Sequence, residues 1–341
     1  LHCVLVNLFG GPLVMTSGNV SDEPQIVDNE EALAALEGIA DSFLLHDRDI
    51  ARRIDDGVVQ TAPLAPMIIR RAGGQTPGTF AIPENLPDLE VAAYGAELKS
   101  SLCLTKNRRA MLSHHIGDLD GAAAYRDFVA ADRDLAALLD HEPSLVAVDS
   151  HPSYLSSRYG RDLADRKGLP CVEIQHHHAH MAAALGANAW DGKTAIGIVL
   201  DGLGFGDDGA IWGGEVLVGN YCSVRRAGHL AYAPLIGGDR AQREPWRNAL
   251  ARLDAAGLSA TSDRLFGEFP VSRLRAAARS VSHAPPSSSV GRLFDAVSAC
   301  LGIVVGSQSY EGEAAMRLEA LASLSDDHGV YDLACVNGVI D

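Results

Sequence analysis

The sequence predicts an α/β protein, and two observations lead to this class. From residue 91 onward, short apolar segments typical of strands alternate with longer segments typical of amphipathic helices. In addition, 47% of the residues are hydrophobic and only 21% are charged, which excludes an intrinsically disordered chain. The length of 341 residues corresponds to two domains or one large domain.

The first 87 residues are predicted to form one domain and a linker. Apolar runs predict strands, and an acidic start followed by spaced apolar residues predicts a helix. A stretch rich in Gly and Pro without periodicity predicts the linker. The predicted strands span residues 12–16, 42–45, 58–61 and 67–69, the helix residues 28–40, and the linker residues 72–87.

Residues 88–341 are predicted to form a second, larger domain with a layered α/β arrangement. Its predicted strands span residues 91–94, 102–105, 110–114, 145–149, 171–174, 195–200 and 211–218. Its predicted helices span residues 125–140, 154–167, 176–186 and 289–301. A Gly-rich turn joins the last two strands, so we expect these to form a hairpin.

Charge, cysteine usage and hydropathy narrow the classes of function. The formal net charge of −16 disfavours nucleic-acid binding, because such a surface repels phosphodiester backbones. Six widely spaced cysteines without a C-x-x-C pair indicate reduced thiols and a cytoplasmic protein. The longest apolar runs are too short to span a bilayer, so we expect no membrane association.

Residues 175–180 read QHHHAH and are the strongest local indication of chemistry. On a helix, His176 and His180 lie one turn apart on one face, a spacing at which neutral imidazoles chelate a divalent metal. Asp201, at the end of an apolar strand, is the candidate third ligand. Such a donor set suits Fe²⁺ or Zn²⁺ better than Mg²⁺. The competing interpretation is a helix start with solvated histidines.

Two Gly-containing turns are candidates for a nucleotide cleft. Residues 200–209 read LDGLGFGDDG, and the strand that follows disfavours a dinucleotide-binding Rossmann turn. The strand that follows instead favours a hairpin whose backbone N–H groups face a phosphate, as in actin-like ATPases. Residues 95–100 read GAELKS in the same layout, with Lys99 as the cation. A plain turn and a solvated lysine are the simpler interpretations.

Three further segments carry polar groups whose role the sequence leaves open. Ser17 and Asn19 follow a predicted strand, where they either cradle an anion or form a turn. The charged stretch around Arg48 is by default a solvated surface. Asp295 and Glu311 lie near helix starts, which attract anions, although ordinary helix-surface charge is the simpler explanation for Asp295.

Ten segments, taken together and in order, resemble one family. They are PLVMTSGNVSDEP, HDRDIARRIDDGVV, GAELKSSLCL, HHIGDL, HPSY, QHHHAHMAAAL, LDGLGFGDDGAIWGGE, PWRN, GRLFDAV and SYEGEAAMRLEAL. This pattern resembles the HypF family of carbamoyltransferases, which mature NiFe hydrogenases. The resemblance implies the C-terminal part of a YrdC-like α/β domain and linker over residues 1–87. Residues 88–341 would then form an actin-like (ASKHA, RNase H-like) α/β domain similar to TsaD.

The resemblance also implies a reaction. ATP, with Mg²⁺, and carbamoyl phosphate give carbamoyl-adenylate in the YrdC-like domain. The actin-like domain then transfers the carbamoyl group to the C-terminal cysteine of the partner HypE, toward the cyanide ligand. The nucleophile is the partner's thiolate, so no catalytic cysteine is expected here. Two alternatives stay open: an O-carbamoyltransferase of natural-product biosynthesis, and a non-catalytic nucleotide-binding actin-like scaffold.

The family's functional positions can be carried onto this sequence. Its metal and catalytic positions correspond to His176, His180 and Asp201. Its nucleotide-binding positions correspond to Lys99, Ser100, Gly202, Gly204, Asp208, Gly209, Asp295, Glu311, Gly312, Ser17, Asn19 and Arg48. The family's acylphosphatase-like domain and zinc modules, the first half of its YrdC-like domain, and its final nucleotide loop and Asp have no counterpart here. We therefore expect a fragment, truncated at both ends, that does not run the full reaction alone.

Overall fold

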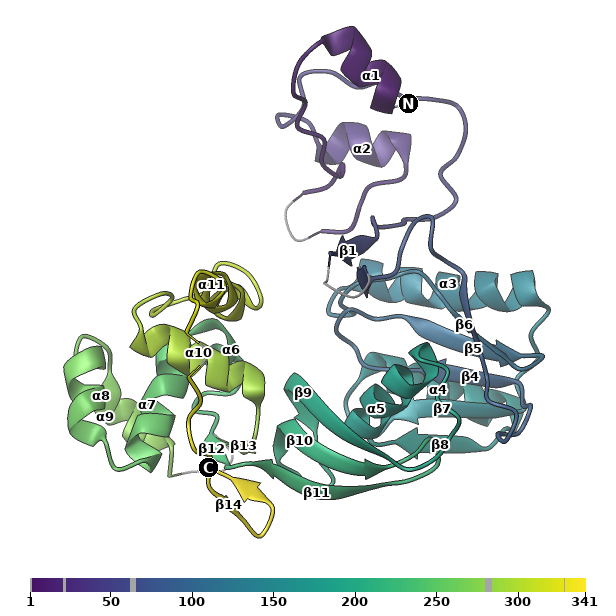
Figure 1. Cartoon of the computed structure of the whole chain (residues 1–341). Helices are drawn as coiled ribbons and strands as arrows, with labels where there is room; N and C mark the ends of the chain where they lie inside the picture. Colours follow the sequence, from purple (N-terminus) through teal and green to yellow (C-terminus); the bar gives the residue numbers. More distant parts are fainter. Residues whose placement is uncertain (1, 21–22, 62–65, 280–283, 328) are drawn as a thin grey trace.

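The computed structural model describes residues 2–20, 23–61, 66–279, 284–327 and 329–341. The chain is a mixed α/β protein, as predicted, and its described strands form three sheets. In Figure 1 the first two helices stand apart at the top, the two large sheets occupy the middle, and a group of helices forms a lobe beside them. Among the described residues, no helix combines the length and apolar character needed to cross a membrane.

The N-terminal region contains two short helices and a two-stranded sheet. Its elements are α1 (His2–Phe9), α2 (Asn29–Ala35), β1 (Val58–Gln60) and β2 (Met67–Arg70). The carboxylate of Asp28 accepts the backbone N–H groups of Glu30 and Glu31, and this cap starts α2 where the sequence predicts a helix. The helix ends before residue 40, and the strands predicted at 58–61 and 67–69 are confirmed as β1 and β2.

Two predicted strands of this region are absent. Residues 12–16 and 42–45 form no strand, and Val14 and Leu44 are 94% and 99% exposed. Their β-forming composition is not sufficient, because a strand needs a hydrogen-bonding neighbour, and no described strand pairs with either segment. Conversely, α1 forms in an apolar opening segment for which no helix was predicted.

A six-stranded sheet follows, in the order β3-β6-β5-β4-β7-β8. Its strands are β3 (Gly78–Ala81), β4 (Val91–Tyr94), β5 (Leu102–Lys106), β6 (Arg109–Leu112), β7 (Leu145–Asp149) and β8 (Cys171–Ile174). Strands β4, β7 and β8 run parallel, whereas β3 to β6 pair antiparallel. Side chains from β4, β5 and β7 form one core with α3 (Ala122–Leu139) and α4 (Leu155–Lys167), and Tyr94 and Phe128 are part of it.

The linker predicted over residues 72–87 is wrong in its middle. Within it, β3 pairs antiparallel with β6 and so extends the six-stranded sheet. Four residues that begin with Gly are too few to show strand periodicity, and the open edge of β6 supplies the pairing instead. The structure therefore places residues 78–81 in the same sheet as the predicted second domain.

A second large sheet carries the predicted hairpin. Its strands are β9 (Ala195–Phe205), β10 (Ile211–Gly219), β11 (Val224–Leu230), β12 (Ala233–Pro234), β13 (Pro286–Ser287), β14 (Cys335–Val336) and β15 (Val339–Ile340). Strands β9 and β10 pair antiparallel, as predicted. Helix α5 (His176–Ala187) packs on this hairpin, where Met181, Val199 and Leu217 form a small core.

The remaining helices form a lobe around Trp246 and Phe266. They are α6 (Asp239–Arg243), α7 (Pro245–Ala255), α8 (Ser259–Phe266), α9 (Val271–Ala277), α10 (Val290–Cys300) and α11 (Glu313–Ala322). The hydroxyl of Ser289, which caps α10, donates to the carbonyls of Asp201 and Gly202. The start of α10 is thereby fixed against the part of β9 that carries Asp201.

Candidate metal centre

Helix α5 begins directly after β8, and Gln175 fixes its position. The side-chain carbonyl of Gln175 accepts the backbone N–H of His178 at 2.9 Å and so caps the helix. Its amide nitrogen donates to the carbonyl of Phe205 on β9 at 3.0 Å. One side chain therefore both starts the helix and ties that start to the end of β9, which places the first turn of α5 beside the strand that carries Asp201.

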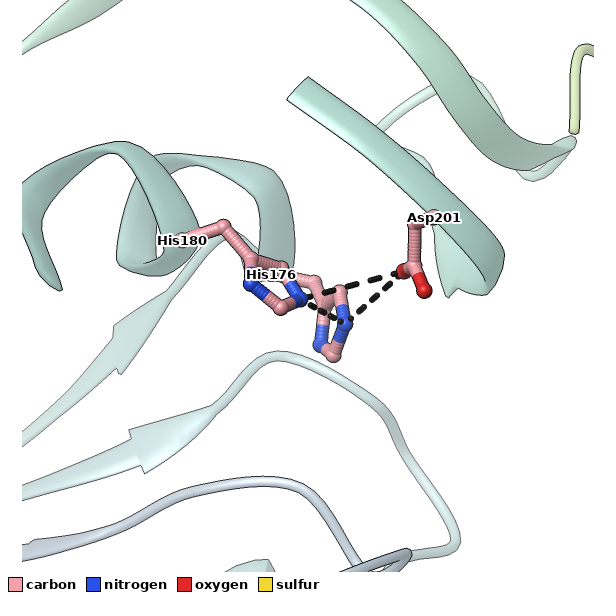
Figure 2. A group of neighbouring side chains, drawn as sticks. All are labelled: His176, His180 and Asp201. Atoms are coloured by element: carbon pink, nitrogen blue, oxygen red, sulfur yellow. Dashed lines mark hydrogen bonds and ion pairs between the residues drawn. The ribbon is translucent and has the colours of Figure 1, made fainter. Parts of the chain in front are cut away.

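Three predicted ligands converge at this junction. One donor atom from each of His176, His180 and Asp201 lies within 4.8 Å of the other two. The Nε2 atom of His176 lies 3.2 Å from His180 Nε2 and 3.2 Å from Asp201 Oδ2, and His180 Nε2 lies 3.9 Å from the same oxygen. Figure 2 shows both imidazoles on one face of α5, turned toward the carboxylate on β9. The spacing of the two histidines therefore gives a shared face, as the sequence predicts.

The charges at this site are strongly coupled. Burial disfavours a proton on His176, but the carboxylates of Asp149 and Asp201 outweigh it and raise the pKa of His176 to about 9. Burial likewise opposes the negative charge of Asp201, yet His176 lowers the pKa of this carboxyl to about 2. Burial and the charge of His176 lower the pKa of His180. The site thus holds Asp201 as an ionised carboxylate beside the imidazoles.

The donor set fits a divalent transition metal. The Oδ2 atom of Asp201 is buried and, within the described part of the chain, accepts no hydrogen bond of normal geometry. Two imidazole nitrogens and one carboxylate oxygen are typical ligands of Zn²⁺ and Fe²⁺, with further positions open to water or substrate. The His180 side chain remains 52% exposed, so a cation has a route from solvent.

The other histidines of the segment have different environments. His178 Nε2 hydrogen-bonds to the carbonyl of Asn220 at 2.9 Å. His177 is fully buried, and burial lowers its pKa to about 4, so it is neutral at physiological pH. Its Nε2 atom has no hydrogen-bond partner among the described residues and lies 3.6 Å from Asp201 Oδ2. A Cβ atom at position 204 would overlap the rings of His176 and His177, so Gly204 permits the close approach of α5 to β9.

Asp208 lies in the turn between β9 and β10, and hydrogen bonds and an ion pair occupy both of its carboxylate oxygens. Its carboxylate accepts the backbone N–H of Ala210 at 3.0 Å, Trp212 Nε1 at 2.8 Å and the Tyr232 hydroxyl at 2.6 Å. It also pairs with Arg226 at 3.2 Å. Its oxygens are therefore committed to the hairpin itself. The neighbouring Gly209 makes the turn with a φ of +76°.

Two other predicted nucleotide positions meet across the molecule. Lys99 Nζ lies 2.7 Å from Glu311 Oε2, and both side chains are largely exposed. Ser100 is buried, and its hydroxyl has no hydrogen-bond partner in the part of the chain that the structure describes. Gly312, with a φ of +78°, is the N-cap of α11 and follows Glu311 directly. The structure thus joins the GAELKS turn to the start of α11, a proximity that local sequence does not encode.

Asp295 is buried in α10, so the simpler prediction of a helix-surface charge is wrong. Burial raises its pKa to about 6, although Arg292 lies 3.1 Å away and opposes this shift. The N–H groups of Asn248 and Gln308 lie 3.4 Å from its two oxygens. This carboxyl therefore belongs to the interior of the helical lobe.

The structure does not bring Ser17 and Asn19 to the metal ligands. Both line a separate cavity of about 1220 Å³ between the N-terminal region and the six-stranded sheet, together with Arg53, Lys99 and His115. Arg48 is exposed and does not line this cavity. Ser17 and Asn19 therefore lie in a cavity apart from the metal ligands, and Arg48 lies outside that cavity.

Asp149 was not among the predicted site residues. It ends β7, and its Oδ2 atom lies 2.7 Å from His176 Nδ1. The same feature that singles out Asp201, a carboxylate at the end of an apolar strand, also describes Asp149 in the sequence LVAVD. Its proximity to the histidines depends on the strand register, which the local sequence does not state.

Three family models match the chain. The HypF Kae1-like domain matches residues 87–187, and the second subdomain of the carbamoyltransferase Kae1-like domain matches residues 197–341. The Sua5/YciO/YrdC family, described as telomere recombination, matches residues 1–72. The N-terminal region is therefore YrdC-like, and the larger part is of the Kae1-like, actin-related type.

The curated relatives that the chain matches are named carbamoyltransferase HypF. The chain is 56% identical to the carbamoyltransferase HypF of Rhodobacter capsulatus, over all of this chain and 46% of the relative. It is 34% identical to the probable carbamoyltransferase HypF of Methanocaldococcus jannaschii, over 91% of this chain and 41% of the relative. The chain thus spans about half the length of the curated relatives it matches.

Solved structures agree in fold. Full-length HypF in its phosphate- and nucleotide-bound form superposes with a TM-score of 0.86 at 36% identity, covering 96% of this chain and 51% of that one. T. kodakarensis HypF superposes with a TM-score of 0.85 at 30% identity, covering 96% and 44%. Sequence and fold lead to the same conclusion: the chain belongs to the HypF family of carbamoyltransferases.

Proposed function

We propose that this chain carries the carbamoyl-transfer part of a HypF carbamoyltransferase that acts in NiFe-hydrogenase maturation. ATP and carbamoyl phosphate are the sources of carbamoyl-adenylate, and the C-terminal cysteine of HypE is the acceptor. The observation that carries this proposal is the convergence of His176, His180 and Asp201 in a chain whose relatives are named carbamoyltransferases. We place the protein in the cytoplasm, where its six unpaired cysteines stay reduced.

In this proposal, residues 1–87 are the C-terminal part of the YrdC-like domain with its linker, and residues 88–341 are the actin-like transferase domain. Ser17 and Asn19 would contact the nucleotide in the first, together with Arg48. In the second, the nucleotide-binding positions would come from the GAELKS turn, the β9-β10 hairpin and the starts of α10 and α11. The ion pair of Lys99 with Glu311 supports a role at the cleft, because it connects the GAELKS turn to the start of α11.

The chemistry is a transfer from a mixed anhydride to a thiol. The HypE thiolate attacks the carbamoyl carbon, the bond from this carbon to the AMP oxygen breaks, and AMP leaves with the electron pair. A divalent Zn²⁺ or Fe²⁺ ion held by His176, His180 and Asp201 would stabilise negative charge on the phosphate or carbonyl oxygen. The chain itself needs no nucleophile, because the acceptor brings its own sulfur.

Intact-mass measurement of HypE tests this proposal. We expect the metal-loaded chain, given carbamoyl-adenylate and HypE, to add one carbamoyl group to the C-terminal cysteine. We expect the His176→Ala variant to lose this transfer, and HypE with a C-terminal serine to remain unmodified. Equal transfer by the wild type and His176→Ala would contradict the proposed site. Transfer to a hydroxyl acceptor with HypE untouched would favour an O-carbamoyltransferase.

The proposed division of labour has its own test. We expect no ATP–pyrophosphate exchange above background when this chain receives ATP and carbamoyl phosphate alone. Exchange that depends on carbamoyl phosphate would show that residues 1–87 form a complete adenylating site.

A further inference from the structure

Asp149 and His176 are brought together by two parallel strands. Strands β7 and β8 pair in parallel, with Asp149 beside Ile174, and α5 begins two residues after Ile174. The Asp149 carboxylate therefore faces the first turn of the helix from the strand ends, where α/β folds collect functional side chains. Its Oδ2 atom lies 2.7 Å from His176 Nδ1, and both side chains are at least nine-tenths buried.

The carboxylate of Asp149 is itself held in one orientation. Its Oδ1 atom accepts the backbone N–H of His151 at 2.8 Å, which leaves Oδ2 for the imidazole. The backbone carbonyl of Asp149 accepts the hydroxyl of Ser157 at 2.9 Å, so the strand end is anchored to α4 as well. Rotation of the side chain would break the bond to His151 and leave a buried carboxylate unsatisfied.

The two nitrogens of His176 face different partners. Nδ1 faces Asp149, whereas Nε2 faces His180 and Asp201, each at 3.2 Å. A carboxylate accepts a hydrogen bond but donates none when ionised, so it selects the imidazole form with the proton on Nδ1. That form leaves the Nε2 lone pair free on the side of the other two candidate ligands.

We propose that Asp149 is a positioning residue for the metal centre: it fixes the ring of His176 and its Nδ1–H tautomer so that Nε2 coordinates the cation. This inference rests on the metal centre of the proposed function. Asp149 is not a ligand in this proposal, because its oxygen lies at the ring nitrogen opposite the one that faces His180 and Asp201. Partners of this kind change metal affinity by about 10- to 100-fold in other metal sites.

A matched control is available in the same domain. Asp132 is also a buried aspartate, and it accepts hydrogen bonds from the hydroxyls of Tyr94 and Tyr159 at 2.9 and 2.7 Å. Asp132→Asn removes the buried charge of a residue on α3 and leaves the three candidate ligands unchanged. A general loss of stability would affect both variants, whereas a positioning role affects Asp149→Asn alone.

The test is a zinc titration of the full chain against a chromophoric chelator. We expect Asp149→Asn to weaken zinc binding about 10- to 100-fold and Asp132→Asn to bind as the wild type does. Equal affinity of Asp149→Asn and the wild type would overturn this inference and leave the metal centre standing. A wild-type chain that binds no zinc would overturn the metal centre and this inference together.

A second measurement is made on the wild type and so does not depend on the folding of Asp149→Asn. Long-range ¹H–¹⁵N spectra of the zinc-loaded, histidine-labelled wild type report which ring nitrogen of His176 carries the proton, with His176→Ala assigning the signal. We expect the proton on Nδ1 and zinc on Nε2. Zinc on Nδ1 would overturn the proposal.

Discussion

Asp201 and Asp208 lie on the same β9-β10 hairpin, among the same kind of Gly-rich sequence, yet their surroundings are opposite. Asp201 Oδ2 is buried, lies 3.2, 3.6 and 3.9 Å from nitrogens of three imidazoles, and accepts no hydrogen bond of normal geometry from the described residues. Asp208 accepts bonds from a backbone N–H, an indole and a phenol, and pairs with Arg226. Because a buried carboxylate needs partners, we expect unused acceptor capacity at a metal-ligand position and saturated oxygens at a scaffold position.

The largest expected effect comes from removing one ligand of the cluster. We expect His176→Ala and Asp201→Ala each to lower zinc affinity by roughly 100-fold or more, because each removes one of three donors. The competition titration with a chelator measures this loss. Asp208→Asn is the matched control, and its zinc affinity should equal that of the wild type. If Asp208→Asn lost zinc as Asp201→Ala does, the distinction between the two carboxylates would be wrong.

The second expected effect is the pH dependence of zinc binding at the cluster that contains Asp201. The pKa of His176 is raised to about 9, so below this pH the imidazole holds a proton that zinc must displace. Asp201, with a pKa of about 2, stays ionised over the whole neutral range. Apparent zinc affinity should therefore rise about tenfold per pH unit from pH 6 to 8. An affinity that stays constant over this range would contradict the assignment of His176.

A third effect concerns the Gly residues between the two aspartates. A methyl group at position 204 would overlap the His176 and His177 rings, whereas position 202 has open space around its Cβ direction. We expect Gly204→Ala to cost about 1–3 kcal/mol of stability and to weaken zinc binding, because α5 must move away from β9. Thermal unfolding and zinc titration measure this, with Gly202→Ala as the nearly neutral control. Equal behaviour of the two variants would show that close approach is not what position 204 provides.

The smallest expected effect is the loss of folding stability when Asp208 is replaced. Asp208→Asn weakens the ion pair with Arg226 while keeping most of the side-chain shape. Since Asp208 is partly exposed, we expect a loss of only about 1 kcal/mol. Urea unfolding of the metal-free protein is the appropriate measurement. A loss of stability that appears only in the presence of zinc would instead assign Asp208 to the metal site.

Much of the fold of the larger region was predictable, because its elements have strong local patterns. The predicted strands 145–149 and 171–174 match β7 and β8, and the segment 176–186 matches α5 within one residue. The N-terminal region was less predictable. There, Val14 and Leu44 look like strand residues, but strand formation depends on neighbours that no local pattern specifies.

The residues of the candidate site likewise include some that local sequence predicts and some that it does not. The i, i+4 spacing of His176 and His180 and the strand-end position of Asp201 are local properties of the sequence. Asp149 was missed because its contact with His176 depends on the parallel register of β7 and β8. The burial of Asp295 was missed because α10 packs inside the helical lobe, and helix periodicity alone does not say which charged face is covered.

By itself, the sequence determined the α/β class, the family, the hairpin and the three side chains able to bind a metal, since each follows from periodicity, motif or residue type. Only the tertiary structure decided which of two similar aspartates on one hairpin is left with unused acceptor capacity, and which carboxylate faces the far nitrogen of His176. Those facts depend on which strand ends and helix starts meet in space. Hydrogen-bond satisfaction is a property of all the neighbours together, and residues distant in the chain supply most of them.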